Sequence, residues 1–174
     1  MKARYLLLAL AALSCTDPSA PAPQGDLLGG LPLLPPPIPI PLDLVRCTPP
    51  PYDSVTQTVG PGGGTIQVGT TTLSVPAGAL DSAVSITAVV PSDTVNHVRF
   101  EPQGLTFLQP ASLTMSYANC NTMQSTDPRS TDPRRIAYTT EALQILEYLP
   151  SVDDVSSQTV TGELHHFSDY AIAW

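Results

Sequence analysis

The chain has 174 residues, of which seven are basic, fifteen are acidic and three are cysteine, and its formal net charge is −8. An acidic surface repels phosphate backbones and anionic headgroups, so we predict that no nucleic acid is a partner. Proline is concentrated before residue 52, which divides the chain into a leader, a spacer and a domain.

Residues 1–14 have the form of a bacterial signal peptide. Lys2 and Arg4 supply positive charge, and the apolar run that ends at Leu13 is too short for a transmembrane helix, which takes about 20 residues. Ser14-Cys15 follows and resembles the lipobox of bacterial lipoproteins, whose cysteine is acylated and becomes the first mature residue. We therefore predict lipidation at Cys15, a stable membrane anchor, and a place in the cell envelope at the outer membrane or cell surface.

An ordinary secretory signal, cleaved near Ala20 or Ala22, is the alternative, because Ala12 and Leu13 depart from the lipobox pattern. Cleavage there would remove Cys15 and leave a secreted protein. With either signal, the chain after Cys15 holds five arginines, no lysine and all fifteen acids, so its formal net charge is −10.

Residues 15–51 are predicted to be a disordered, proline-rich stalk. Twelve of the twenty prolines lie in this segment. Proline lacks a backbone donor and fixes φ, so we expect extended polyproline II at about 3.1 Å per residue. A docking peptide for an aromatic-lined groove is the alternative, and we favour the plain spacer.

Residues 52–174 are predicted to form one all-β domain, an antiparallel β-sandwich. Apolar and polar residues alternate in short runs, and helical periodicity is almost absent. Such runs, separated by turn residues, indicate two packed sheets with one wet face each. The predicted strands are 65–68, 71–75, 84–88, 112–117, 135–140, 143–149, 159–164 and 170–174. The stretch 141–149 also permits a helical turn.

Turn chemistry marks the ends of these strands. The glycine-rich segment 60–64 and the Pro-Ala-Gly segment within 75–80 predict chain reversals. Asp153-Asp154 is also predicted to be a turn. Two near-copies of Ser-Thr-Asp-Pro-Arg, at 125–129 and 130–134, predict a polar loop over 121–134.

Cys47 and Cys120 remain after the leader. In an exported chain two such cysteines favour a disulfide, which would tie the end of the stalk to the sandwich. Two free thiols are the alternative. A metal pair is disfavoured because no further cysteine or histidine lies nearby in the sequence.

Four motifs follow one another in 55–174: Gly62-Gly63-Gly64 before a strand, the turn 75–80, the stretch with Pro102, Gly104, Phe107, Pro110 and Leu113, and His166-Phe167-Ser168-Asp169-Tyr170. In this order they resemble those of the ZU-five domain, the β-sandwich of ankyrins, netrin receptors and a tight-junction scaffold. The resemblance implies an interaction module whose partner is a protein or another envelope component, with no cofactor.

In some relatives the His-Phe-Ser motif cleaves itself. The resemblance therefore implies an alternative function, autoproteolysis at Phe167–Ser168, with Ser168 as nucleophile and His166 or His165 as base. We favour a structural corner, because cleavage needs a strained peptide that a sequence cannot show. In that corner His166 faces the core and bonds to backbone or to Ser168.

Other candidate sites are weaker. Glu163 and His165 share one face of a strand, but two ligands do not make a metal site, so we favour an exposed ion pair. Ser168, His166 and Asp169 lie too close in sequence to converge as a catalytic set. A hydrolase or metal enzyme is the least favoured class, and we predict no enzyme, no metal and no cofactor.

Overall fold

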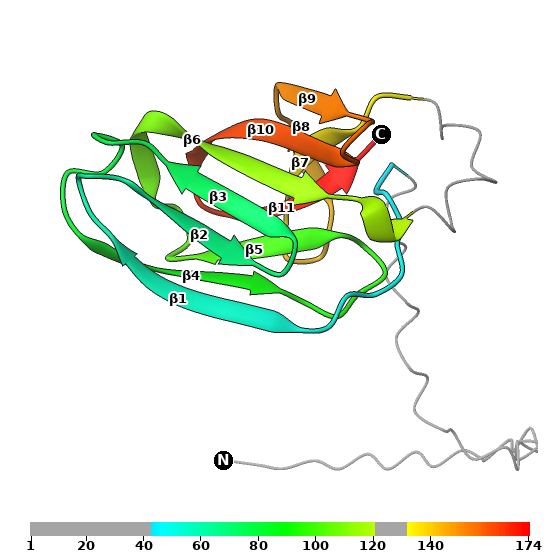
Figure 1. The fold of residues 1–174 in the computed structure, drawn as a ribbon, viewed down its shortest axis with the longest axis horizontal. Coiled ribbons are helices and arrows are strands. Elements are labelled where there is room, and N and C mark those ends of the chain that lie inside the picture. The colour runs from blue at the N-terminus through cyan, green and yellow to red at the C-terminus, as the bar shows by residue number, and fades with distance from the viewer. Residues whose placement is uncertain (1–42, 121–131) are drawn as a thin grey trace, which may run out of the picture. The chain divides into compact units, whose positions relative to one another are not determined.

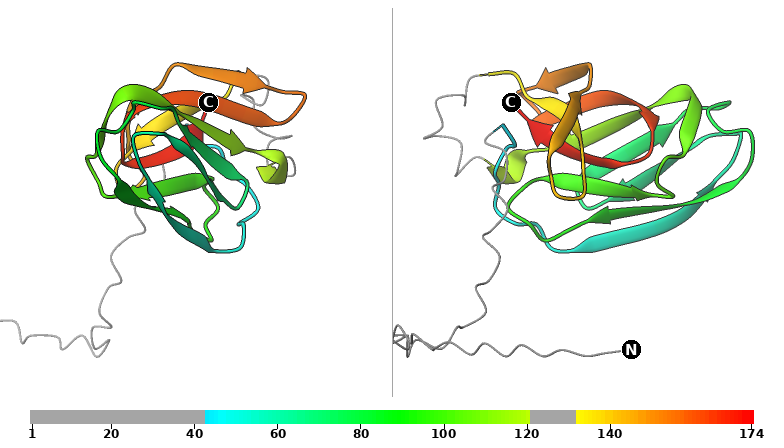
Figure 2. Two further views of the ribbon diagram at one scale, coloured as in Figure 1. Left: turned by 60° about the vertical axis from the view of Figure 1, so that its left-hand side comes forward. Right: turned by 180° about the vertical axis from the view of Figure 1, so that it is seen from behind.

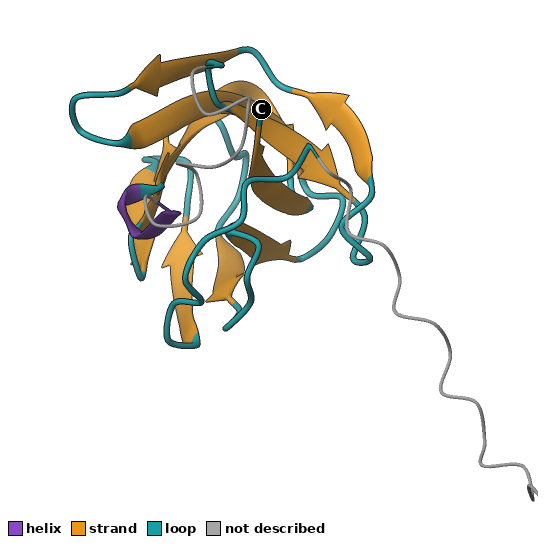
Figure 3. Ribbon diagram, turned by 90° about the vertical axis from the view of Figure 1, so that its right-hand side faces the viewer, coloured by secondary structure: helices purple, strands orange, loops and turns teal. Residues whose placement is uncertain are grey.

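The computed structural model describes residues 43–120 and 132–174, which form two antiparallel sheets (Figure 1). Their strands are β1 (Asp53–Val59), β2 (Gly64–Val68), β3 (Thr71–Val75), β4 (Val84–Val90), β5 (His97–Glu101), β6 (Thr106–Ser116), β7 (Arg135–Thr139), β8 (Ile145–Tyr148), β9 (Ser151–Asp154), β10 (Thr159–His166) and β11 (Asp169–Ala173). A short 3₁₀ helix, η1 (Ala118–Cys120), follows β6 and is purple in Figure 3. None of the helices in these ranges is long and apolar enough to cross a bilayer.

The two sheets pack face to face, as the views in Figures 1 and 2 show. One sheet has the strand order β1-β4-β5-β11-β7-β8, and the other has the order β2-β3-β6-β10-β9. The prediction of an antiparallel β-sandwich is confirmed. The predicted signal peptide, Cys15 and the predicted stalk up to residue 42 lie outside the described residues.

Alternating side chains build the core between the sheets. Ile66 on β2 pairs with Leu73 on β3, and Leu73 pairs with Leu113 on β6, so the three side chains form one apolar row. Ile86 and Phe100 of the opposite sheet belong to the same buried cluster. Period-two alternation places such residues on one face of each strand, and their burial drives the sheets together.

Strand β11 is buried on both faces. Tyr170 and Ile172 belong to the main core, whereas Ala171 and Ala173 belong to a second cluster that includes Leu44. The second cluster lies on the other face of this strand because successive side chains point to opposite faces. Both faces of the C-terminal strand are therefore covered, and part of one cover comes from chain preceding β1.

Three strands, β1, β5 and β9, were not among the sequence predictions. Strand β1 exposes most of its side chains, and β9 is a four-residue edge strand that carries two carboxylates. Edge strands tolerate polar and charged residues, which removes the alternation that a sequence reading relies on. The predicted strand over 143–149 is shorter, because Leu143 has a φ of 60° and belongs to a turn.

The prediction that Asp153-Asp154 is a turn is wrong. Both residues belong to β9, where Asp153 pairs with Val160 and Asp154 pairs with Thr159. The turn comes directly afterwards, and the Asp154 carboxylate accepts hydrogen bonds from Ser156 and Ser157. These bonds, that of the Ser156 hydroxyl foremost, lower the pKa of Asp154 to about 2.

The two predicted chain reversals are present. The Gly63 N–H donates to the Gly60 carbonyl at 2.9 Å, which closes the turn between β1 and β2. Gly78 in the second turn has a φ of 82°, a left-handed conformation that favours glycine. The first turn passes from one sheet to the other, because β1 and β2 belong to different sheets.

Candidate functional site

Residues 43–48, which we call the N-terminal strap, lie against the C-terminal strand. The Val45 N–H donates to the Ile172 carbonyl at 2.9 Å, and the Trp174 N–H donates to the Asp43 carbonyl at 2.9 Å. Leu44 and Val45 are 2% and 0% exposed. Composition assigned this segment to the stalk, but its two apolar side chains complete the core, so the packed part of the chain begins before residue 52.

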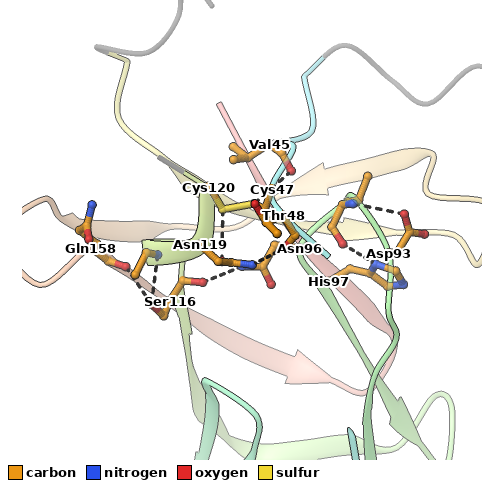
Figure 4. The surroundings of a disulfide bond; sticks show 12 residues. Val45, Cys47, Thr48, Asp93, Asn96, His97, Ser116, Asn119, Cys120 and Gln158 are labelled. Carbon is orange, nitrogen blue, oxygen red and sulfur yellow. Dashed lines mark hydrogen bonds between the residues drawn. A yellow bond between two sulfur atoms is a disulfide. The ribbon is translucent and has the colours of Figure 1, made fainter. Parts of the chain in front are cut away.

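A disulfide between Cys47 and Cys120 locks the strap, as Figure 4 shows. This confirms the predicted pairing. Both cysteines are fully buried, and the Cys47 N–H donates to the Thr94 carbonyl at 2.7 Å. Thr48 and Asn119 add two hydrogen bonds beside the disulfide, one through the Asn119 side chain at 2.8 Å and one through the Thr48 N–H at 3.1 Å.

The strap is therefore joined to three different parts of the sandwich: β11, the loop before β5, and η1. Backbone hydrogen bonds make the first two joins, and a covalent bond makes the third. The backbone N–H groups of the buried residues Val45 and Cys47 are thereby satisfied. Asp43, the first described residue, is held beside the C-terminal strand by its bond to Trp174.

The His-Phe-Ser motif lies where β10 passes into β11. His165 is exposed, and His166 is half-buried, with a register irregularity against β6 between Leu164 and His166. The His166 ring packs edge-on against Tyr138 with centroids 4.9 Å apart. Of the two partners predicted for His166, backbone and Ser168, the structure shows the backbone: His166 Nδ1 lies 3.5 Å from the Phe167 carbonyl oxygen. The Tyr170 hydroxyl also lies 3.4 Å from His166 Nδ1 and donates to the His166 carbonyl at 2.6 Å.

Burial, with the charges of Tyr138 and Glu147 as smaller causes, raises the pKa of the Tyr170 phenol above its ordinary value. The phenol thus stays protonated and keeps donating to the His166 carbonyl. This bond holds the strand end that precedes the His-Phe-Ser corner.

Phe167 anchors the corner in the core. Its ring stacks on Phe100 at 5.2 Å between centroids and meets Phe107 edge-on at 4.9 Å. The Phe167 N–H donates to the Leu105 carbonyl at 2.7 Å, and the Phe167 carbonyl accepts from the Gly104 N–H at 3.0 Å. The peptide on either side of Phe167 is therefore fixed by both packing and backbone hydrogen bonds.

Ser168 is 7% exposed, yet among the described residues no side chain or backbone group bonds to its hydroxyl. Its carbonyl accepts from the Phe100 N–H at 3.1 Å. Neither His165 nor His166 is within hydrogen-bond distance of the Ser168 hydroxyl in the described part of the chain. The structure thus brings the predicted nucleophile and histidines into one corner without joining them.

The Ser168 side of this corner lines a hollow of about 290 Å³, which we call the Ser168 pocket. Arg99 crosses it, with its Nε donating to Asp169 Oδ1 at 3.0 Å and its Nη1 lying 3.5 Å from Glu141 Oε1. Asp169 therefore pairs with an arginine and not with a histidine. Glu101 and Leu146 lie on the wall of the same hollow.

A buried polar cluster was missed by the sequence reading. Arg134, predicted to lie in a polar loop, is 7% exposed, and its guanidinium lies 4.3 Å from the Tyr117 ring centroid and 5.0 Å from that of Trp174. Asp153 accepts from the Tyr117 hydroxyl at 2.7 Å and pairs with Arg134 at 3.5 Å. Burial, together with the Asp153 carboxylate, raises the pKa of Tyr117 to about 12.

The predicted ion pair between Glu163 and His165 is absent from the described residues, although both side chains are exposed on β10. In the same ranges no three His, Cys, Asp or Glu side chains gather in a way that could hold a metal ion. These two residues thus share a strand face without forming a site.

No protein-family model matches this sequence, and a search of curated proteins finds no match. The resemblance to the ZU-five domain accordingly stays a prediction that rests on the four motifs.

Proposed function

We propose that this chain is a lipid-anchored protein of the cell envelope that displays a β-sandwich at the end of a proline-rich stalk. Cys15 carries the lipid, residues 15–42 separate it from the domain, and the sandwich serves as an interaction or structural module. The ZU-five resemblance supports this role, because in the animal proteins that domain binds partners or packs on neighbouring domains.

The observation that carries the proposal is the locked strap. A force on an anchored domain acts at the point where the stalk is attached to it. In this chain that attachment point is the strap. The disulfide between Cys47 and Cys120 and the backbone bonds to β11 would pass such a pull into the sandwich. A segment held by hydrogen bonds alone peels open more readily than one that also carries a covalent cross-link.

The disulfide also supports export. Stable disulfides form in oxidising compartments and are rare in a reducing cytosol. Both sulfurs are buried, which keeps the pair away from soluble thiols. The strap and its cross-link are thus suited to a chain that folds outside the cytosol.

Membrane fractionation of the full chain in a bacterial host tests the anchor. We expect the wild-type chain in the membrane fraction, and the Cys15→Ser chain in the soluble fraction or retained as an unprocessed precursor. Ser14→Ala, a small-for-small change next to the cysteine, serves as the matched control and should stay in the membrane fraction. Equal partitioning of wild type and Cys15→Ser would contradict lipid anchoring.

Self-cleavage between Phe167 and Ser168 is the second candidate. The carbonyl that the Ser168 hydroxyl would attack already accepts a hydrogen bond from Gly104 N–H, a donor placed to stabilise charge on that oxygen. In this reaction a bond forms between Ser168 Oγ and the Phe167 carbonyl carbon, the peptide C–N bond breaks, and the hydroxyl proton passes to the new amine. Water then hydrolyses the ester.

The mass of the chain after denaturation tests self-cleavage. Cleavage predicts loss of residues 168–174 from the wild-type mass and an uncut chain for Ser168→Ala. His165→Gln is the control, because its exposed side chain contacts neither Phe167 nor Ser168 in the described residues. A wild-type chain that still ends at Trp174 after long incubation at neutral pH would exclude self-cleavage.

A further inference from the structure

We infer that the Ser168 pocket binds the cationic end of a partner's side chain, an arginine guanidinium or a lysine ammonium group. This role of the pocket rests on the interaction role proposed above. A pocket for such a side chain needs an excess of negative charge, a polar group that is not already bonded within the protein, and apolar surface for the methylene chain of the arginine or lysine.

The charges of the pocket favour a cation. Three carboxylates, those of Glu101, Glu141 and Asp169, line it together with one guanidinium, that of Arg99. Asp169 is matched by Arg99, since its side chain is 5% exposed and the contact is 3.0 Å. Glu141 has an 83% exposed side chain and a longer contact of 3.5 Å, so it is only weakly engaged.

Glu101 is the other carboxylate with capacity to spare. One of its oxygens accepts from the Gln103 N–H at 2.9 Å, and the residue is exposed. A carboxylate has about four lone-pair sites, so a second donor can bind it. With Asp169 matched by Arg99, the mouth of the pocket keeps two carboxylates for a ligand.

The Ser168 hydroxyl is the polar group left over. The residue is more than nine-tenths buried, it lines the pocket, and no described residue bonds to its hydroxyl. Ser168 Oγ is not among the described side-chain atoms that are fully buried without a partner, so the hydroxyl is open to the hollow. A guanidinium or ammonium N–H that enters the pocket would donate to this oxygen.

Two side chains suit the stem of such a ligand. Leu146 is 55% exposed although it is apolar, and Tyr138 lines the same hollow. Lysine and arginine lay their methylene groups along apolar surface while the charged head stays among polar groups. An aromatic ring adds attraction for a cation that lies near its face.

An anion or a divalent metal ion would fit the Ser168 pocket less well than a cationic side chain. An anion would meet an excess of negative charge, because Glu101 and the weakly engaged Glu141 add to the matched pair of Asp169 and Arg99. A divalent metal ion needs several ligands at short distance, and the described acidic residues do not gather in that way. The rest of the chain after Cys15 is acidic as well, which steers basic partners toward the domain.

The test uses the full chain extracted from membranes into detergent, titrated with capped peptides that differ only in a central arginine, lysine or citrulline. The readout is the backbone amide signals of Leu146, Ser168 and Asp169 in NMR spectra. We expect the arginine peptide, the lysine peptide or both to shift these signals, with the stronger one identifying the cation. Citrulline, which is nearly the same shape as arginine but neutral, should leave them unmoved.

Variants sharpen the test. Glu101→Gln combined with Glu141→Gln removes both spare carboxylates and should weaken binding about tenfold, as expected for two solvent-exposed ion pairs. Ser168→Ala removes only the hydroxyl and should weaken binding about fivefold. Glu163→Gln removes an exposed carboxylate of β10 that does not line the pocket, and should bind like wild type.

A citrulline peptide that shifts the same signals, or a double variant that binds like wild type, would overturn the inference. So would a folded chain whose signals move with none of the three peptides. Because the readout does not depend on lipid at Cys15, a failure of anchoring leaves it unchanged. A lipidated chain whose signals do not shift with the cationic peptides would contradict the role of the pocket but not the lipid anchor.

Discussion

At the scale of single residues, the cluster of Arg134, Asp153 and Tyr117 is the feature that ties β6, β7 and β9 together. Arg134 stacks on Tyr117, and Asp153 accepts from both the Tyr117 hydroxyl and the Arg134 backbone N–H at 2.9 Å. A buried carboxylate is tolerated only when its oxygens are bonded in this way. The loop that ends at Arg134 is thereby fastened to the sandwich.

Replacing Tyr117 by Phe removes one member of this cluster and leaves the ring in place. We expect the free energy of unfolding at neutral pH to fall by about 1.5–3 kcal/mol, the range for a hydrogen bond to a charged group. Tyr52→Phe, at a residue that is 66% exposed, is the matched control and should change it by less than about 0.5 kcal/mol. Urea unfolding at pH 7 measures both, and an unchanged Tyr117→Phe value would contradict the role of the cluster.

The difference in unfolding free energy between wild type and Tyr117→Phe should also depend on pH. The pKa of Tyr117 is raised to about 12 in the folded chain, above its ordinary value near 10. The protonated phenol therefore stabilises the fold fully below pH ~10, and this contribution is lost as pH rises from about 10 to about 12. The stability gap between wild type and Tyr117→Phe should narrow over that window, and a gap that widens would contradict the assignment.

Sequence reasoning reached some of these residues and not others. Cys47 and Cys120 could be paired because they are the two cysteines that follow the predicted leader and its Cys15. Arg134 could not be placed, because its burial depends on Tyr117 and Trp174, which are distant in sequence. Ser168 was singled out for its motif, but its pocket depends on Arg99 and Glu141, which only the sheet pairing brings near.

At the scale of elements, the strap is what turns a proline-rich segment into part of a domain. Its disulfide joins residues 73 apart in sequence. The reduced unfolded chain gains the conformational freedom of that loop, which the chain-entropy model puts at roughly 4 kcal/mol. The disulfide therefore stabilises the fold by restricting the unfolded chain, in addition to the stability that the packing of the strap contributes.

The double variant Cys47→Ser with Cys120→Ser should therefore lose roughly 4 kcal/mol of unfolding free energy. Urea unfolding with and without reductant measures the loss. Reduced wild type is the internal control and should fall to the stability of the double variant, while reductant should not change the double variant itself. Equal stability of oxidised wild type and double variant would show that the cross-link does not stabilise the fold.

The strands show where pattern reading works. β2, β3 and β6 pack one face on the core, and their alternating side chains predict them well. β5 also alternates, with Val98 and Phe100 buried between polar neighbours, but it is only five residues long and one of its polar residues, His97, is buried as well. The strap was missed because prolines stand on both sides of it, at 41 and at 49–51, and give the whole segment the composition of a spacer. Its own burial depends on contacts with β11, which the sequence does not reveal.

At the scale of the whole molecule, a predicted leader, a proline-rich segment and a cross-linked sandwich follow one another along the chain. An acidic net charge after Cys15 keeps such a domain soluble and away from anionic headgroups. The proposed anchor supplies attachment, the stalk supplies distance, and the strap supplies a fixed join. The anchor and the cross-link each change the mass of the chain in a different way.

The intact mass of the protein extracted from membranes of a bacterial host, measured with and without reductant, tests the lipid, the disulfide and the C-terminal end together. The account predicts a chain that begins at Cys15 with acyl groups attached, ends at Trp174 and gains the mass of two hydrogens on reduction. An unlipidated chain that begins after Cys15 would contradict the central claim and make this a secreted protein.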